Sequence, residues 1–161
     1  MSRLAGINKN DVVNGEGICV SVFLQGCPWR CKGCHNPETW FEDGGEEIQD
    51  EDLFINNILY YIKQNGILRN FSLLGGEPLY DTNIKLSLKI LEKVKETYPT
   101  IKTYVWTGAT MEWLETHYKI DKVLENIDVL IVGPYIEEQR DITLNLRGSK
   151  NQQVLYKSID F

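Results

Sequence analysis

Residues 18–34 read ICVSVFLQGCPWRCKGC, an apolar segment that runs directly into three closely spaced cysteines. The segment from Ile18 to Gln25 is rich in β-branched residues and stops at Gly26, which is typical of a buried strand. Because side chains alternate along a strand, one face is uniformly aliphatic and should contact helices: Ile18, Val20, Val22 and Leu24. Cys19 falls on the opposite face, where we expect a buried, inert thiol.

Downstream of this strand, apolar runs alternate with segments of helical period. Asp50 can cap a helix that runs to about Gln64. The later elements that the pattern predicts, in chain order, are a strand over 71–74, a helix capped by Asp81 and ended before Pro99, a strand over 101–106, one or two short helices over 111–124, a strand over 128–132 and a last strand over 153–157.

The alternation of strands and helices predicts the fold class. Strands joined through helices run parallel, with right-handed crossovers. A closed eight-stranded barrel needs about 250 residues, and this chain has 161. We therefore expect one α/β domain over residues 1–161, a partial, open (β/α) barrel with a mostly parallel, curved sheet. A flat doubly wound sheet is the alternative. Both folds bind ligands at the carboxyl ends of the strands.

Composition and charge exclude several classes of protein. A net charge of −6 argues against a nucleic-acid partner, which needs Lys and Arg to replace counterions. No apolar run approaches the roughly 20 residues that span a membrane, and residues 1–6 lack the apolar stretch of a signal peptide. We therefore expect a cytoplasmic protein with no membrane contact. Clustered cysteines in such a protein more often bind metal or perform redox chemistry than form disulfides.

The cysteine loop is the strongest chemical signal. Cys27, Cys31 and Cys34 offer three thiolates on one loop that leaves a strand. Such a loop could hold a [4Fe–4S] cluster and leave one iron without a protein ligand, as in catalytic metal sites. Arg30 and Lys32 could offset the negative charge of the cluster.

Two other readings of the same loop stay open from spacing alone. A structural zinc site would need a fourth ligand, and His35 directly follows Cys34, where it is poorly placed to bind the same ion. A redox dithiol formed by Cys31 and Cys34 has suitable spacing. That reading leaves unexplained Cys27 and the glycine turn at 75–77 after the next predicted strand.

A resemblance rests on further stretches. The Cys-x3-Cys-x2-Cys loop is followed by the turn Gly75-Gly76-Glu77-Pro78. Other distinctive stretches span nearly the whole chain: 14–17 (NGEG), 23–27 (FLQGC), 33–40 (GCHNPETW), 106–108 (WTG), 133–135 (GPY) and 147–152 (RGSKNQ). In this set and order the chain resembles the radical S-adenosylmethionine superfamily, and within it the activases of anaerobic ribonucleoside-triphosphate reductase.

The resemblance implies a reaction and a set of roles. The cluster and S-adenosylmethionine would give a 5′-deoxyadenosyl radical, which would install a glycyl radical on the large reductase subunit. The electron would come from a donor such as flavodoxin. Glu77 would accept a hydrogen bond from the ammonium group of S-adenosylmethionine, and the cofactor contacts would be Gly33, Cys34, His35, Asn36, Gly75, Gly76, Glu77 and Thr107. A radical enzyme that acts on a small molecule, such as a deazaguanine synthase, is the alternative within the superfamily.

The chain departs from the family pattern at four positions: Cys19, Ala109, Val132 and Gln153. None lies in the cysteine motif, so they bear on adenosine or partner contacts rather than on the reaction. Arg147 and Lys150 are candidates for a docking surface.

Overall fold

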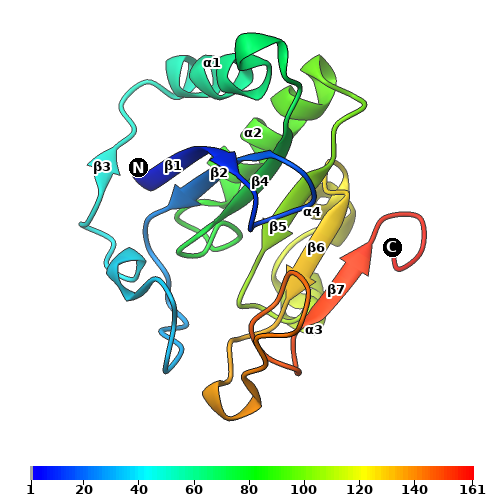
Figure 1. The fold of residues 1–161 in the computed structure, drawn as a ribbon. Coiled ribbons are helices and arrows are strands. Elements are labelled where there is room, and N and C mark those ends of the chain that lie inside the picture. Colours follow the sequence, from blue (N-terminus) through cyan, green and yellow to red (C-terminus); the bar gives the residue numbers. More distant parts are fainter. Residues whose placement is uncertain (1) are drawn as a thin grey trace.

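The computed structural model describes residues 2–161, so Met1 of the predicted 1–161 domain lies outside it. The described chain forms one sheet and four α-helices (Figure 1). The strands are β1 Arg3–Asp11, β2 Cys19–Leu24, β3 Glu46–Glu47, β4 Asn70–Gly75, β5 Thr103–Trp106, β6 Val129–Val132 and β7 Gln153–Tyr156. The helices are α1 Glu51–Ile62, α2 Ile84–Thr97, α3 Met111–His117 and α4 Ile120–Leu124. None of these helices has the length and apolar character that crossing a bilayer requires.

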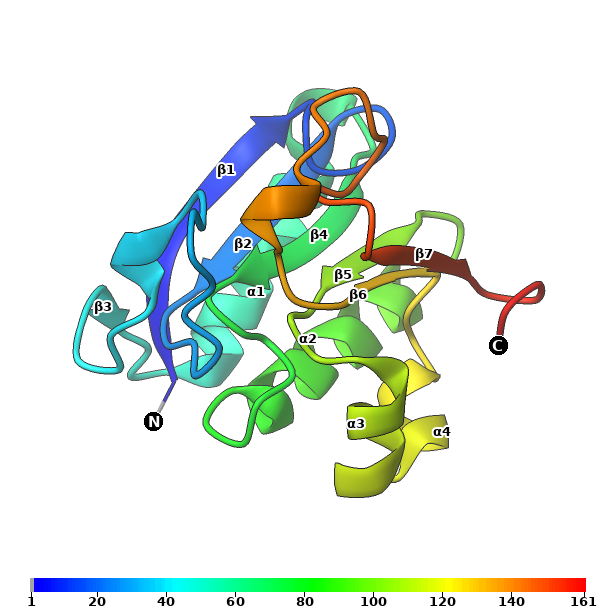
Figure 2. The same cartoon turned by 90° about the horizontal axis from the view of Figure 1, so that it is seen from below.

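The sheet is mixed and open, with strand order β3-β1-β2-β4-β5-β6-β7. The four central strands β2, β4, β5 and β6 are parallel, while β1, β3 and β7 pair antiparallel at the two sides. The predicted α/β class with a parallel centre is confirmed, although the sheet is less parallel than expected. Each crossover moves in one direction, so right-handed connections place all four helices on one face (Figure 2). A doubly wound sheet would reverse direction, so that alternative is wrong.

Strand β1 was not expected from the sequence. Its residues RLAGINKND lack regular alternation, and its pairing with β2 is interrupted by register shifts after Leu4 and after Asn8. It forms because β2 needs a partner on its free side, where Ile7 pairs with Val22. Tertiary pairing thus overrides a weak local preference for the extended state.

The helix starts follow the sequence in one case and depart from it in the other. Asp50 caps α1 as predicted, because its Oδ1 accepts a hydrogen bond from the Leu53 amide at 3.0 Å. The prediction that Asp81 caps α2 is wrong. Asn83 occupies that position without a capping side-chain bond, and Asp81 instead accepts a hydrogen bond from the Tyr118 hydroxyl at 2.8 Å.

The main core lies between the sheet and the helices. Three of the four residues of the predicted aliphatic face pack there, with the apolar sides of β4, β5, α1 and α2: Val20, Val22, Leu24, Ile58, Leu73, Val105, Ile90 and Val94. Ile18, the fourth, precedes β2 and is 38% exposed, so the prediction is wrong for that residue. A smaller apolar cluster covers the opposite face near β7, where Tyr104, Val129 and Ile131 contact Trp106, Leu146 and Val154. The loops that follow β1 and β6 lie on this second face (Figure 2).

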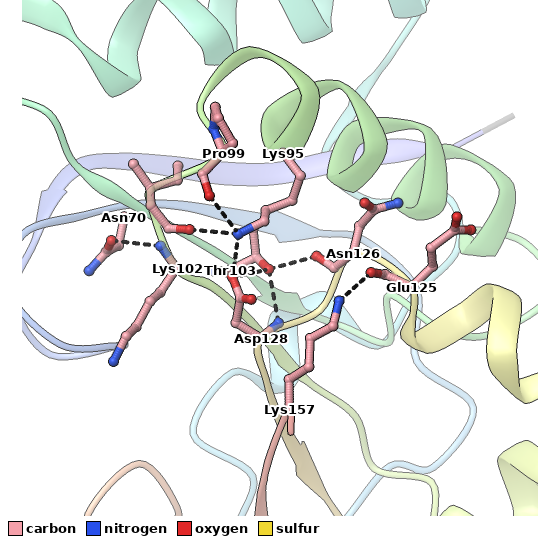
Figure 3. Close-up of polar contacts among 10 residues, drawn as sticks. Asn70, Lys95, Pro99, Lys102, Thr103, Glu125, Asn126, Asp128 and Lys157 are labelled. Carbon is pink, nitrogen blue, oxygen red and sulfur yellow. Dashed lines mark hydrogen bonds and ion pairs between the residues drawn. The ribbon is translucent and has the colours of Figure 1, made fainter. Parts of the chain in front are cut away.

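A polar network closes the amino ends of the parallel strands (Figure 3). Lys95 on α2 donates hydrogen bonds to the Asp128 carboxylate at 2.9 Å and to the Ile101 carbonyl at 2.8 Å. The Thr103 amide also donates to Asp128, at 2.9 Å, and the Thr103 hydroxyl donates to the Asn126 carbonyl at 2.6 Å. The network ties α2 to the starts of β5 and β6 at the end where parallel α/β folds carry stability rather than chemistry.

Candidate metal and cofactor site

A cavity of about 440 Å³ lies at the carboxyl ends of the parallel strands, where the sequence predicts the site. The loops after β2 and after β6 descend to this edge of the sheet (Figure 1). The cavity is lined by all three cysteines of the loop, by the turns after β4, β5 and β6, and by residues 144–148. The strand ends predicted to converge therefore do converge.

Main-chain hydrogen bonds hold the cysteine loop where it leaves β2. The Gly26 amide donates to the Thr39 carbonyl at 2.7 Å, and the Cys27 amide donates to the Trp40 carbonyl at 3.1 Å. These bonds close the loop on itself between residues 26 and 40. Arg30 has a φ of 47°, a left-handed conformation that lets the chain turn sharply between Cys27 and Cys31.

The three thiols of the loop are free and half-buried, and all three face the cavity. Burial raises the pKa of Cys27 to about 11, although backbone groups of Trp29 and Arg30 oppose the shift. A thiolate there would need a positive iron beside it. Within residues 2–161, no three Cys, His, Asp or Glu side chains are placed to hold a single metal ion. A cluster instead spreads three thiolates over three irons, so thiols arranged around one cavity fit it better than a mononuclear zinc.

The two glycines of the 75–77 turn allow the end of β4 to lie close to the end of β2. A Cβ atom on Gly76 would lie 2.5 Å from the Leu24 carbonyl oxygen, and one on Gly75 would also collide with the Leu24 main chain. The Gly76 amide donates to the Leu24 carbonyl at 3.0 Å, and the Glu77 amide donates to the Gly26 carbonyl at 2.7 Å. Both glycines line the cavity, but their missing side chains make room for β2.

Glu77 has a different environment from the one expected. Its side chain is buried and accepts four hydrogen bonds. Oε1 accepts from the Trp29 indole and the Gly108 amide, both at 2.7 Å. Oε2 accepts from the Leu79 amide at 2.9 Å and the Thr107 hydroxyl at 2.8 Å. Because a carboxylate offers about four acceptor positions, none remains for the ammonium group of a cofactor. The predicted contact with the ammonium group would therefore require displacement of one of these donors, and it stays a prediction.

The expected contacts at residues 33–36 divide into two sets. His35 and Asn36 line the cavity beside Cys34, and the Asn36 amide donates to Sγ of Cys34 at 3.4 Å. Gly33 does not line it, among the residues that the structure describes. Gly33 has a φ of 78° and packs so closely on Glu137 that a Cβ atom would collide with that carboxylate. The absence of a side chain at Gly33 therefore allows the cysteine loop to pack against the loop that contains Glu137.

The loop of residues 133–152 supplies a further wall, of which the strand-end pattern indicates only the turn that follows β6. Gln152 organises it: Nε2 donates to the Gly133 carbonyl at 3.0 Å, and Oε1 accepts from the Gly148 amide at 2.9 Å. Arg147 donates to the Gln152 carbonyl at 2.6 Å and faces the cavity, while Lys150 is exposed. Trp29, from the cysteine loop, also lines the cavity, and no sequence signal had selected it.

The amino-acid sequence of this chain is similar to those of known proteins. Residues 13–155 match the family model described as a 4Fe-4S single cluster domain. The anaerobic ribonucleoside-triphosphate reductase-activating protein of Haemophilus influenzae is 37% identical over 143 residues, which cover 88% of this chain and 90% of the relative. That of Vibrio cholerae is 37% identical over 89% of this chain and 91% of its own. That of enterobacteria phage T4 is 31% identical over 89% and 87%. The chain therefore belongs to the family of anaerobic ribonucleoside-triphosphate reductase-activating proteins.

Proposed function

We propose that this protein is a radical S-adenosylmethionine activase of anaerobic ribonucleoside-triphosphate reductase, acting as one domain in the cytoplasm. The observation that supports this most is that three free thiols of one loop line the same cavity as the turns after β4 and β5. We regard the open sheet as a segment of a (β/α) barrel, because its crossovers all wind in one direction.

Different residues of the chain would hold the cluster and S-adenosylmethionine. Cys27, Cys31 and Cys34 would ligate three irons of a [4Fe–4S] cluster. When reduced, such a cluster cleaves S-adenosylmethionine and supplies a 5′-deoxyadenosyl radical. His35, Asn36 and the backbone of 75–76 line the cavity in which S-adenosylmethionine would bind beside the cluster. The buried side chains of Thr107 and Glu77 support that wall through their mutual hydrogen bond.

The target of the radical would be a glycine on the reductase. A primary carbon radical attacks what is nearest, so the reaction must be shielded from water. Val12 and Val13 are adjacent and are 70% and 77% exposed, and Val13 lines the cavity, so a partner segment could cover apolar side chains at its edge. Glycine suits the role because it has no side chain to hinder approach. Arg147 and Lys150 remain candidates for docking, and an electron donor such as flavodoxin would reduce the cluster.

The test of this proposal is anaerobic reconstitution with iron and sulfide. We expect about four irons per chain and 5′-deoxyadenosine on addition of S-adenosylmethionine and dithionite. Replacing Cys27, Cys31 or Cys34 by Ala should lose iron, whereas Cys19→Ala should keep it, because Cys19 does not line the cavity. Binding of stoichiometric zinc with no iron uptake would contradict the proposal and favour a structural site.

A further inference from the structure

We propose that Trp29 is a positioning residue: its indole N–H, bonded to the buried Glu77 carboxylate, fixes the cysteine loop against the turns that follow β4 and β5. This inference rests on the proposed function, because the loop and the turns are the parts that would hold the cluster and S-adenosylmethionine. It assigns to Glu77 a link between these parts rather than a contact with the cofactor.

The hydrogen bonds of Glu77 come from three separate segments. Trp29 belongs to the cysteine loop, Leu79 follows β4, and Thr107 and Gly108 follow β5. The bond from Trp29 is therefore the one through which this carboxylate holds the cysteine loop, and its length is 2.7 Å. Burial raises the pKa of Glu77, while its four donors favour the ionised form. Three of the four donors are N–H groups, which can only donate, so Glu77 serves as an acceptor for each of these three segments.

Packing on several sides restrains the indole ring of Trp29 beside this bond. Its ring packs edge-on against Trp113 of α3, with centroids 5.2 Å apart, and against Tyr80 at 6.4 Å. On another side it touches Gly108, where a Cβ atom would lie 2.5 Å from Cδ1 of the ring. The ring thus contacts α3 and the turns after β4 and β5, and its remaining surface faces the cavity.

The consequence concerns the geometry of the loaded site. Cys27 and Cys31 flank Trp29 in the sequence, so a displacement of Trp29 moves two of the three cluster thiols together. Main-chain bonds from the 75–77 turn to Leu24 and Gly26 fix only the start of the cysteine loop. The hydrogen bond from Trp29 to Glu77 adds the contact that fixes the loop between Cys27 and Cys31 relative to the wall that would carry S-adenosylmethionine. Reactions between bound groups depend steeply on such distances.

The experiment compares Trp29→Phe, Glu77→Gln and the double variant in reconstituted protein. S-adenosylmethionine binding is followed by the change that it causes in the electron paramagnetic resonance spectrum of the reduced cluster. We expect Trp29→Phe to keep its iron and to bind S-adenosylmethionine about tenfold more weakly, the size of one hydrogen bond to a charged group. The double variant should bind S-adenosylmethionine almost as tightly as the single variant with the lower affinity, because both substitutions break the same hydrogen bond.

Two measurements keep the test decisive. Hydrogen exchange of residues 27–36 in the iron-free protein should speed up in Trp29→Phe but not in the control Tyr98→Phe. That control also removes one hydrogen bond, from the Tyr98 hydroxyl to the Leu59 carbonyl, but on the helix side of the fold. Unchanged exchange and unchanged affinity in Trp29→Phe would overturn the proposal. The proposal would also be overturned if Glu77→Gln lowered the affinity for S-adenosylmethionine while Trp29→Phe did not, because that result would indicate direct contact between Glu77 and the cofactor. Failure of the wild-type protein to form 5′-deoxyadenosine would refute the proposed function, and the exchange comparison would still test Trp29.

Discussion

Gly108 and Trp29 pack so closely that a Cβ atom on Gly108 would lie 2.5 Å from Cδ1 of the indole ring. The same glycine donates its amide hydrogen to Glu77 at 2.7 Å. The turn after β5 and the cysteine loop after β2 therefore meet without space for one additional carbon atom.

Replacing Gly108 by Ala should push the Trp29 ring out of its site. We expect a loss of about 1–3 kcal/mol in the free energy of unfolding, because overpacking strains rigid neighbours. Urea unfolding of the iron-free protein measures it. Gly6→Ala is the matched control, since nothing lies within 4 Å of a Cβ atom there. Equal stability of the two variants would show that the ring moves freely.

Lys95→Met should destabilise the fold by about 1–3 kcal/mol while leaving iron binding intact. The substitution leaves the Asp128 carboxylate, whose side chain is only 22% exposed, without its cation. The network lies at the amino ends of the strands (Figure 3), whereas the cysteines line the cavity at the carboxyl ends. Urea unfolding and iron analysis check the two halves of this expectation.

Lys93→Met on the same helix provides the control for Lys95. Lys93 pairs with Glu96 at 3.8 Å across largely exposed side chains, so its loss should cost less than about 0.5 kcal/mol. If both variants lost equal stability, the Lys95 network would stabilise the fold no more than an exposed ion pair does, which would contradict the prediction.

Stability should depend on the ionisation of Asp11 at acid pH. Burial alone would raise its pKa, but hydrogen bonds from the Val13 amide and from the amide and side chain of Asn14 outweigh burial and lower the pKa of Asp11. A lowered pKa stabilises the fold above the unfolded value and loses that contribution as the pH falls through the folded value. The stability gap between wild type and Asp11→Asn should therefore be constant from about pH 7 to about pH 5 and shrink towards about pH 3. An unchanged gap at the lowest pH would contradict this assignment.

Cys19 should resist thiol reagents in the folded protein. Its side chain is fully buried, so a thiol reagent cannot reach it, and burial also raises its pKa. The pKa of Cys27 is raised too, but the loop cysteines are partly exposed, so access sets the order of reaction. In iron-free protein the three half-buried loop cysteines should react first, and Cys19 should react only after denaturation. Mass spectrometry of labelled peptides distinguishes the four sites. Rapid labelling of Cys19 in the native state would show that the loop between β1 and β2, which packs on its thiol, opens.

The sequence predicted the elements whose patterns are local. The apolar β2, the short helices α3 and α4 and the strand β7 lie within a few residues of their expected bounds. Strand β1 was missed because its polar segment is extended only through pairing with β2. The cap of α2 was wrong because Asp81 bonds instead to Tyr118, a contact between residues far apart in the sequence.

The site was predictable at the level of motifs but not of side-chain roles. The strand-end rule placed the cysteines and the turns after β4, β5 and β6 around one cavity. Nothing local indicates that Glu77 turns inward to bond Trp29, because that pairing joins residues 48 positions apart. The same holds for Gly33, whose close neighbour Glu137 comes from a distant loop.

The most direct test of the account is the transfer of a radical to a glycine of another protein. The reconstituted protein is mixed anaerobically with dithionite, S-adenosylmethionine and an anaerobic ribonucleoside-triphosphate reductase, and an electron paramagnetic resonance spectrum is recorded. The account predicts a doublet glycyl signal that is lost with Cys27→Ala in this chain or with Gly→Ala in the partner. Formation of 5′-deoxyadenosine with no glycyl signal, together with efficient turnover of a free small molecule, would contradict it.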